Sequence, residues 1–595
     1  MCNWNQFRGF QLQRSIILNG GSLWWQSGYS DGSYGIPESD GNSGGTFYSL
    51  SLAQQFNTDA TNLSGLFSQG PNPATTQVNF EDGAMFGNDQ EIILYGGLTR
   101  PTDSKDLSGS RELLGYRSPD SGSDHDVGSF FNSSLPSDMT RYVTHGGQVS
   151  VPSENLAFYF GGMRGPDWAP ITSDDASANT TADTLIMANF TAAGDEKIWR
   201  NSTLPSFVSS RAHPQSVWIP VSEQGIFAVI GGVKAPEDIY PDGLSSSQQE
   251  QDSLLDPGFM TAIPLYDIAQ DKWYLQNTTG DIPTSGRASF CSTLASASDG
   301  SSHNIYIYGG YNGQNSSATP FDDVYILSLP SFIWIKAYTG SSRHGRSGHQ
   351  CFGVLPNQML VVGGLHKDPS ICLDGGIIQT FSLNDLEFQT QYSPDAVEEY
   401  LVPNVVRKQI GGTTKGNASR TAPTTWGDSE LQSLFDTPYT KKISTWYPYN
   451  SSESTVEFNA TSGRGQKPTW VIPVAVGVTI PTVGAVCVVI MWLALQRKRH
   501  LQHGLCDCSP GKRHWLHIFS IKSGRSLPNE ADGVPIEPPP TSQSIRVVGR
   551  ISELPAYEQS PRMSRKSSIG ETPIDMYFPG LETVAGPKRQ TDTEL

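Results

Sequence analysis

Two hydrophobic patterns divide the chain. In residues 1–412, short runs of β-branched and aromatic residues end at paired glycines, and polar stretches separate them. Such runs are typical of short buried strands that end at tight turns, where glycine accepts a positive φ. Residues 470–495 instead contain no Asp, Glu, Lys, Arg or His. A helix of that length covers the roughly 30 Å of a bilayer's hydrocarbon core, so we expect one transmembrane helix there.

Six copies of the strand-and-diglycine unit precede the apolar run. Further strand-like runs surround each pair, such as 322–329 followed by Trp334, although the second copy offers only Leu113 and Leu114. Four short strands per repeat are typical of a propeller blade. The pattern predicts an all-β propeller of six blades, and residues 400–406 leave a seventh blade open. The repeat glycines are Gly20, Gly21, Gly96, Gly97, Gly161, Gly162, Gly231, Gly232, Gly309, Gly310, Gly363 and Gly364.

The repeated elements resemble the kelch repeat over residues 1–412. The elements that carry this resemblance are the strand ending in Gly-Gly, the stretch Asp322-Asp323-Val324-Tyr325 and the trailing Trp334. The layout is similar to that of single-pass kelch membrane proteins of filamentous fungi, with a propeller of the kelch and galactose-oxidase type. The resemblance implies a propeller at 1–412, a glycosylated Ser/Thr-rich stalk at 413–469, the helix, and a disordered cytoplasmic tail at 496–595. Within the stalk, Trp426 and residues 431–435 are candidates for a short helix packed on the propeller.

Flanking charge and glycosylation motifs predict the topology. Arg497, Lys498 and Arg499 follow the apolar run, which predicts a cytoplasmic tail. All Asn-x-Ser/Thr motifs precede the run, so we expect an extracellular or lumenal glycoprotein, anchored in the plasma membrane. No signal peptide is visible after Met1, and we expect that a first exon is missing from the sequence. The acceptor asparagines are Asn62, Asn132, Asn179, Asn189, Asn201, Asn277, Asn315, Asn417, Asn450 and Asn459.

The charge of the chain restricts the classes of partner, and its cysteines allow disulfide bonds. The net charge of −18 divides into about +3 after residue 495 and −21 before it. An acidic front part excludes nucleic acid as a partner, because that needs a basic face. Four cysteines precede the helix (Cys2, Cys291, Cys351 and Cys372), which allows three pairings. We expect Cys351 to pair with Cys372, because one predicted blade contains both.

The tail carries short motifs for cytoplasmic partners. Ser567 and Ser568 follow two basic residues, and Ser560 and Thr572 each precede a proline, so all four are candidate kinase sites. Residues 554–557 resemble the proline-tyrosine ligands of WW domains. The sequence therefore suggests kinases and WW-domain proteins as partners of the tail.

The sequence shows no recognisable catalytic, cofactor-binding or metal-ligating set. It has no nucleophile elbow, zincin motif or phosphate loop. The histidines before the helix form no familiar spacing with tyrosine and cysteine, and we expect His349 to be a hydrogen-bonded strand residue. We therefore expect a binding module for a protein or glycan rather than an enzyme, with no cofactor. Two alternatives stay open: a propeller enzyme, either similar to copper radical oxidases or modifying a metabolite, and a cytoplasm-facing kelch scaffold.

Overall fold

The computed structural model describes residues 1–449, apart from residues 40, 41, 43, 60–62, 71–77, 101–108, 119–127, 174 and 192–196. The chain divides into two compact units, Met1–Thr469 and Trp470–Leu595, and every described residue belongs to the first. The expected helix at 470–495 and the tail at 496–595 lie outside the described residues. Among the described residues, no helix has the length and apolar character needed to span a bilayer.

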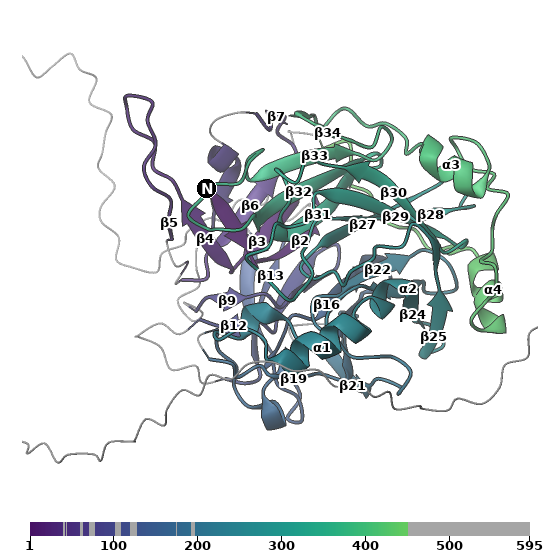
Figure 1. Cartoon of the computed structure of the whole chain (residues 1–595), viewed down its shortest axis with the longest axis horizontal. Coiled ribbons are helices and arrows are strands. Elements are labelled where there is room, and N and C mark those ends of the chain that lie inside the picture. Colours follow the sequence, from purple (N-terminus) through teal and green to yellow (C-terminus); the bar gives the residue numbers. More distant parts are fainter. Residues whose placement is uncertain are drawn as a thin grey trace, which may run out of the picture. The chain divides into compact units, whose positions relative to one another are not determined.

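Six blades of four antiparallel strands each follow one another in chain order around a common centre (Figure 1), and further short strands extend the sheets of blades 5 and 6. Blades 1 to 3 consist of β2 (Arg8–Leu12), β3 (Ser15–Asn19), β6 (Phe47–Ser51) and β8 (Phe67–Gln69); β10 (Ala84–Gly87), β11 (Glu91–Tyr95), β13 (Glu112–Arg117) and β14 (Ser129–Ser134); and β16 (Gly147–Val151), β17 (Leu156–Phe160), β20 (Thr184–Asn189) and β21 (Ile198–Thr203). Blades 4 to 6 consist of β22 (Gln215–Ile219), β23 (Ile226–Ile230), β24 (Ala262–Asp267) and β25 (Lys272–Asn277); β27 (Cys291–Ser296), β28 (His303–Tyr308), β29 (Asp323–Leu329) and β30 (Ile333–Thr339); and β31 (Ser347–Leu355), β32 (Gln358–Leu365), β33 (Ile378–Ser382) and β34 (Glu387–Gln389).

The first strands of successive blades pack side by side from blade 1 to blade 6, and Gly9 of blade 1 lies beside Gln350 of blade 6, which makes the sheets a β-propeller. The apolar second strands are completely buried and fill the space between blades, as β3, β11, β17, β23 and β28 do. The weak second copy is a true blade, because Leu113 and Leu114 lie in β13 between β11 and β14.

The suggestion of a seventh blade at 400–406 is wrong. Tyr400 and Val402 pack into the core between blades 5 and 6, and the helix α3 (Asn404–Ile410) then begins. Pro403 lacks the N–H that a strand pairing needs, and Gly411, at a φ of 75°, ends the helix. The described residues therefore form six blades.

The propeller has two different faces. Because the first two strands of a blade are antiparallel, each diglycine lies beside the start of its own first strand. We call this side the loop face, since it carries the long segments that follow the diglycines, and the opposite side the turn face. Gly310 shows why glycine is needed here: its φ is 84°, and a Cβ would lie 2.5 Å from the Ala288 carbonyl oxygen.

Shorter elements lie in the loops and turns between the strands, at the edges of the blades and after blade 6. The strands are β1 (Asn3–Asn5), β4 (Ser22–Trp25), β5 (Glu38–Ser39), β7 (Phe56–Asn57), β9 (Phe80–Glu81), β12 (Leu98–Thr99), β15 (Val143–Thr144), β18 (Met163–Arg164), β19 (Thr180–Thr181), β26 (Thr279–Gly280) and β35 (Gln391–Tyr392). The helices are η1 (Leu63–Leu66), η2 (Pro152–Glu154), η3 (Pro166–Trp168), η4 (Glu237–Ile239), α1 (Ser246–Leu255), α2 (Gly258–Thr261) and α4 (Ser429–Asp436).

The ring closes between the N-terminal residues and blade 6. Strand β1 pairs with β32 through Trp4 and Gly364, and Trp4 is completely buried among side chains of blades 1 and 6. A disulfide joins Cys2 to Cys372, with their Cα atoms 4.5 Å apart. Hydrogen bonds add to the closure, because Gln350 Nε2 donates to the Phe7 carbonyl and the Tyr392 hydroxyl donates to the Leu52 carbonyl.

The expected Cys351–Cys372 disulfide is wrong. Cys351 lies on the innermost strand of blade 6 and is bonded to Cys291, on the innermost strand of blade 5. Cys372 lies in the segment after β32, beside the N-terminal residues. The reason is topological: a propeller places first strands of neighbouring blades side by side, and this separates two cysteines of one blade.

Residues 413–449, at the start of the expected stalk, pack along the turn face. Leu431 and Leu434 of α4 enter the core between blades 4 and 5. Farther along, the Tyr439 hydroxyl donates to Glu154 at the first turn of blade 3, and Tyr449 donates to the Val354 carbonyl of blade 6. The helix expected around 431–435 is thus observed, and the segment links the turns of several blades.

Candidate functional site

Six equivalent residues surround the propeller axis at the loop face, one where each first strand begins. All have φ in the left-handed region, between 53° and 68°, although five of them are not glycine. Backbone hydrogen bonds join several neighbours, including Asp82 N to Gln6 O (2.5 Å) and His213 N to His145 O (2.5 Å). Such strained positions cost about 1–2 kcal/mol each and cluster at functional sites. The six residues, which we call the axial ring, are Gln6, Asp82, His145, His213, Ser289 and Gly348.

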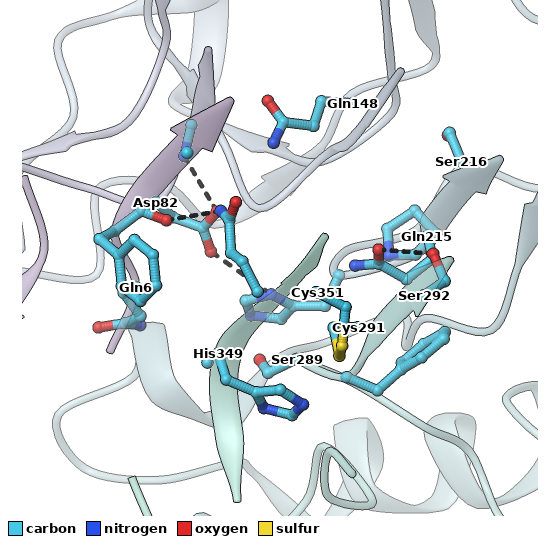
Figure 2. Close-up of a pocket in the computed structure, with 18 of the residues that line it drawn as sticks. Gln6, Asp82, Gln148, Gln215, Ser216, Ser289, Cys291, Ser292, His349 and Cys351 are labelled. Carbon is cyan, nitrogen blue, oxygen red and sulfur yellow. Dashed lines mark hydrogen bonds and ion pairs between the residues drawn. A yellow bond between two sulfur atoms is a disulfide. The ribbon is translucent and has the colours of Figure 1, made fainter. Parts of the chain in front are cut away.

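The axial ring opens into a cavity of about 250 Å³ along the axis. Figure 2 shows Gln6 and Asp82 on one side of this cavity and His349 with the Cys291–Cys351 disulfide on another. Glutamines of the first strands line it farther down and bridge the blades; Gln148, for example, accepts a hydrogen bond from the Met85 amide. The cavity is small and polar, so it suits an ion, water or a compact polar group rather than a large apolar ligand.

Two histidines and two carboxylates meet at one side of the axial ring. The rings of His145 and His213 lie nearly perpendicular, with centroids 4.2 Å apart. His145 Nε2 lies 3.6 Å from an Asp82 oxygen and 3.5 Å from an Asp238 oxygen. His213 presents Nδ1 to Asp82 at 3.5 Å and Nε2 to Asp238 at 3.2 Å. Ligand atoms of Asp82, His145 and His213 all lie within 4.8 Å of one another.

Asp238 reaches the axis from the loop of blade 4. It belongs to the short helix η4, and Gln6 Nε2 donates to its Oδ2 at 3.0 Å. Burial acts to raise the pKa of Asp238, but His213 and His145 lower that pKa well below its ordinary value. Asp238 is therefore an anion at neutral pH.

Burial and charge set the protonation of the histidines. His145 is completely buried, and neither ring nitrogen has a hydrogen-bond partner within the described part of the chain. Burial acts to lower the pKa of His145, but the charges of Asp238 and Asp82 raise that pKa above its ordinary value. The nearby Tyr311 is buried as well, and burial together with the Asp238 charge raises its hydroxyl pKa well above the ordinary value. The cluster thus has strong affinity for positive charge.

A second group of metal-type side chains lies lower in the cavity. Ligand atoms of Cys291, His349 and Cys351 also lie within 4.8 Å of one another. The two sulfurs form a disulfide and so are not thiolates. Burial and the neighbouring Arg346 lower the pKa of His349 to about 3, so its ring is neutral. His349 lies on strand β31 as expected, but its ring nitrogens have no hydrogen-bond partner among the described residues, so it is not the hydrogen-bonded residue we predicted.

The sequence analysis missed the axial cluster. It recognised no metal-ligating set, whereas the structure brings Asp82, His145 and His213 together as side chains of metal-binding type. The expectation that the chain binds no metal stays a prediction. A signal was present: in each repeat these residues stand at the position of Ser289 and Gly348, just where the first strand begins. Aligning the repeats on that position, rather than on the diglycines, would have put all three in one column.

The predicted modification sites lie elsewhere. Of the sequon asparagines, Asn132, Asn179, Asn201, Asn277, Asn315 and Asn417 are exposed and Asn189 is half-buried. Asn62, Asn450 and Asn459 lie outside the described residues, as do Ser560, Ser567, Ser568 and Thr572. The exposed side chains are accessible to a glycosyltransferase, so the prediction of glycosylation is unchanged.

The chain is similar to a kelch repeat-containing protein of Arthroderma benhamiae (strain ATCC MYA-4681 / CBS 112371). The two are 27% identical over 464 residues, which covers 69% of this chain and 64% of that protein. The chain therefore spans somewhat less than two thirds of the relative's length. A solved structure titled "Structure of YjhT" matches with a TM-score of 0.38 and 13% identity, covering 65% of this chain and 97% of that one. No protein-family model matches the sequence.

Proposed function

We propose that this chain is a kelch-type propeller that binds a partner protein on its loop face and is held at a membrane by residues 470–495. The observation that carries the proposal is an exposed apolar surface on this face. It belongs to the β4–β5 hairpin, where Tyr29, Tyr34 and Ile36 have 58%, 60% and 79% of their surface exposed. Large exposed apolar side chains grouped in one place are typical of interaction sites.

The hairpin holds these side chains in an ordered frame. The Tyr29 amide donates to Ser33 O at 2.9 Å, and Asp31 accepts from both the amide and the hydroxyl of Ser33. At the base of the hairpin, Gln26 contacts Cys372, next to Ile371, which is 62% exposed. Tyrosines on a Gly- and Ser-rich frame provide contact area at a low cost in conformational entropy. The surface therefore suits protein recognition, and binding of a glycan is the other outcome that the test below distinguishes.

The experiment compares three forms of the full chain in nanodiscs: the parent, the triple variant Tyr29→Ser/Tyr34→Ser/Ile36→Ser, and the control Ile198→Ser. Ile198 is 54% exposed on an outer strand, so its replacement removes apolar surface away from the hairpin. Arrays of proteins and of glycans are probed with each form. We expect a protein ligand whose binding weakens at least tenfold in the triple variant only. Equal binding by all three forms would refute the proposal, and selective loss of a glycan would replace the protein with a glycan.

Features of the sequence support membrane attachment. The apolar run 470–495 is long enough to span a bilayer. The chain crosses the turn face before it, so the last described residue, Tyr449, is tied to blades 1 and 6 on that side. We propose an extracellular or lumenal propeller at the plasma membrane and a cytoplasmic tail that binds kinases and WW-domain proteins. Endoglycosidase treatment tests this orientation, because unchanged electrophoretic mobility would argue for the cytoplasm-facing scaffold.

A second candidate function is a propeller enzyme. The observation that favours it is the group of two histidines and two carboxylates on the axis. The copper radical oxidase version also needs a cysteine at the axis. Here Cys291 and Cys351 are joined to each other, which does not favour that version.

A further inference from the structure

We propose that Asp82, His145 and His213 bind one divalent transition-metal ion, such as Zn²⁺, at the loop-face end of the propeller axis. The inference is independent of membrane attachment and of the partner on the hairpin. Its starting point is the donor set: two imidazoles with carboxylates are typical ligands of Zn²⁺ and neighbouring metals, and calcium or magnesium sites are built from oxygen instead.

The distances suit an ion between the side chains. Donors at about 2.0–2.2 Å from a tetrahedral ion lie roughly 3.3–3.6 Å from one another. His145 Nε2 and His213 Nδ1 lie 3.6 and 3.5 Å from Asp82 Oδ2. A direct hydrogen bond between imidazole and carboxylate would bring these atoms to about 2.7–2.9 Å. The donor atoms of the three side chains are therefore spaced as ligands of one ion, and they lie farther apart than atoms joined by direct hydrogen bonds.

The burial of His145 is only partly compensated, because its ring faces the carboxylates of Asp82 and Asp238 at 3.6 and 3.5 Å. Its side chain is completely buried, yet both ring nitrogens lack a hydrogen-bond partner among the described residues. An unpaired polar group in the interior costs about 1–3 kcal/mol. His145 is also held in the left-handed region, at a φ of 56°, which adds backbone strain. A metal bond to Nε2 would compensate for both.

Asp238 completes the site by accepting a hydrogen bond from the ring nitrogen of His213 that does not face the ion. Its carboxylate lies 3.2 Å from His213 Nε2, on the side of the ring opposite Nδ1. Metal-binding histidines usually donate their second N–H to a carboxylate, which fixes the ring and strengthens the ligand. Asp238 also lies 3.5 Å from His145 Nε2, so it can instead serve as a fourth ligand. Asp82 and His213 line the axial cavity, which gives the ion a route in and a free side toward a ligand.

The ion would also join separate parts of the propeller. Asp82, His145 and His213 each lie two residues before the first strand of blades 2, 3 and 4, and Asp238 comes from the loop of blade 4. Metal binding therefore stabilises the native ring by linkage, since these ligands are together only in the folded state.

The test uses the untagged full chain in detergent, stripped with a chelator and titrated with Zn²⁺ and with Co²⁺. The variants are His145→Gly, which suits the left-handed backbone, and His213→Asn, because asparagine tolerates that conformation better than most residues. Ser289→Gly is the control at an equivalent ring position, and His349→Gln tests the lower group. We expect one Zn²⁺ per chain, visible absorption bands of tetrahedral Co²⁺ and a higher melting temperature with metal.

In the two ligand variants, affinity should fall at least 100-fold and the metal-dependent rise in melting temperature should disappear. Ser289→Gly and His349→Gln should bind as the parent does. Absence of stoichiometric binding in the parent would overturn the proposal. So would binding that survives in the folded His145→Gly and His213→Asn variants, or that is lost in His349→Gln. If His145→Gly does not fold, His213→Asn and the Co²⁺ spectrum of the parent still decide the question.

Discussion

The disulfide that closes the ring allows a quantitative prediction. Replacing both partners, as Cys2→Ser/Cys372→Ser, removes a cross-link between residues 370 apart. The chain-entropy relation gives about 6 kcal/mol for a loop of this length, while measured losses for native disulfides are typically about 2–5 kcal/mol. We expect the free energy of unfolding to fall by about 2–5 kcal/mol. The loss stays within this range because other contacts also hold the N-terminal residues: β1 pairs with β4 and β32, and Asn3 Nδ2 donates to the carbonyls of Pro369 and Ile371.

Urea unfolding followed by tryptophan fluorescence measures this loss. Trp4 contributes to this signal, since it is completely buried against Phe7 and Tyr48 at the closure. The dependence of unfolding free energy on urea concentration should also become steeper, because the denatured chain without the cross-link exposes more surface. Hydrogen exchange of the amides in β1 should accelerate more than exchange in the second strands of the blades.

The matched control is Cys291→Ser/Cys351→Ser. This bond spans only 60 residues, for which the same relation gives about 4 kcal/mol, and its loss leaves β1 in place. A loss below about 1 kcal/mol in Cys2→Ser/Cys372→Ser, with β1 amides still protected, would contradict the view that this disulfide closes the ring. Equal acceleration of β1 exchange in both variants would do the same.

Three further predictions concern stability. Glu91→Ala should cost about 1.5–3 kcal/mol in thermal or urea unfolding, because it removes a carboxylate that pairs with the buried ammonium of Lys197 at 2.5 Å and with Arg117 at 2.9 Å; a loss under 1 kcal/mol would contradict this. Burial raises the pKa of Asp252 to about 6, and burial with the Asp252 charge raises that of Asp256 to about 8. Both pKa values exceed those of the unfolded chain, so the folded state binds more protons and the free energy of unfolding falls as pH rises from about 4 to about 8. Asp252→Asn should make the fall of stability with pH shallower and add about 2 kcal/mol at pH 8. An unchanged dependence on pH would contradict this prediction. Ser289→Gly should stabilise the protein by about 0.5–1 kcal/mol, because glycine adopts the φ of 53° at this position without backbone strain. The measurement is the urea midpoint, which should rise. A lower midpoint would indicate that the serine side chain stabilises the protein by more than its backbone strain costs.

The local pattern of the chain was enough to predict the blades. A buried strand needs a run of apolar residues, and a turn against a neighbouring backbone needs glycine; both requirements are met within a few residues and are visible without any partner. Even the weak second copy formed β13 at Leu113 and Leu114. Residues 400–406 show the limit of this approach, since the same apolar character suits a strand or the packed start of α3.

Contacts between blades were decided only by the tertiary structure. Cys351 pairs with Cys291 and not with Cys372, because neighbouring first strands lie side by side around the axis. His145 and His213 meet Asp82 for the same reason, although 63 residues separate His145 from Asp82 and 68 separate it from His213. Local patterns determine which residues form a strand and which end it. Closure of the ring determines which side chains meet on the axis, because that depends on the number of blades and on where each first strand begins.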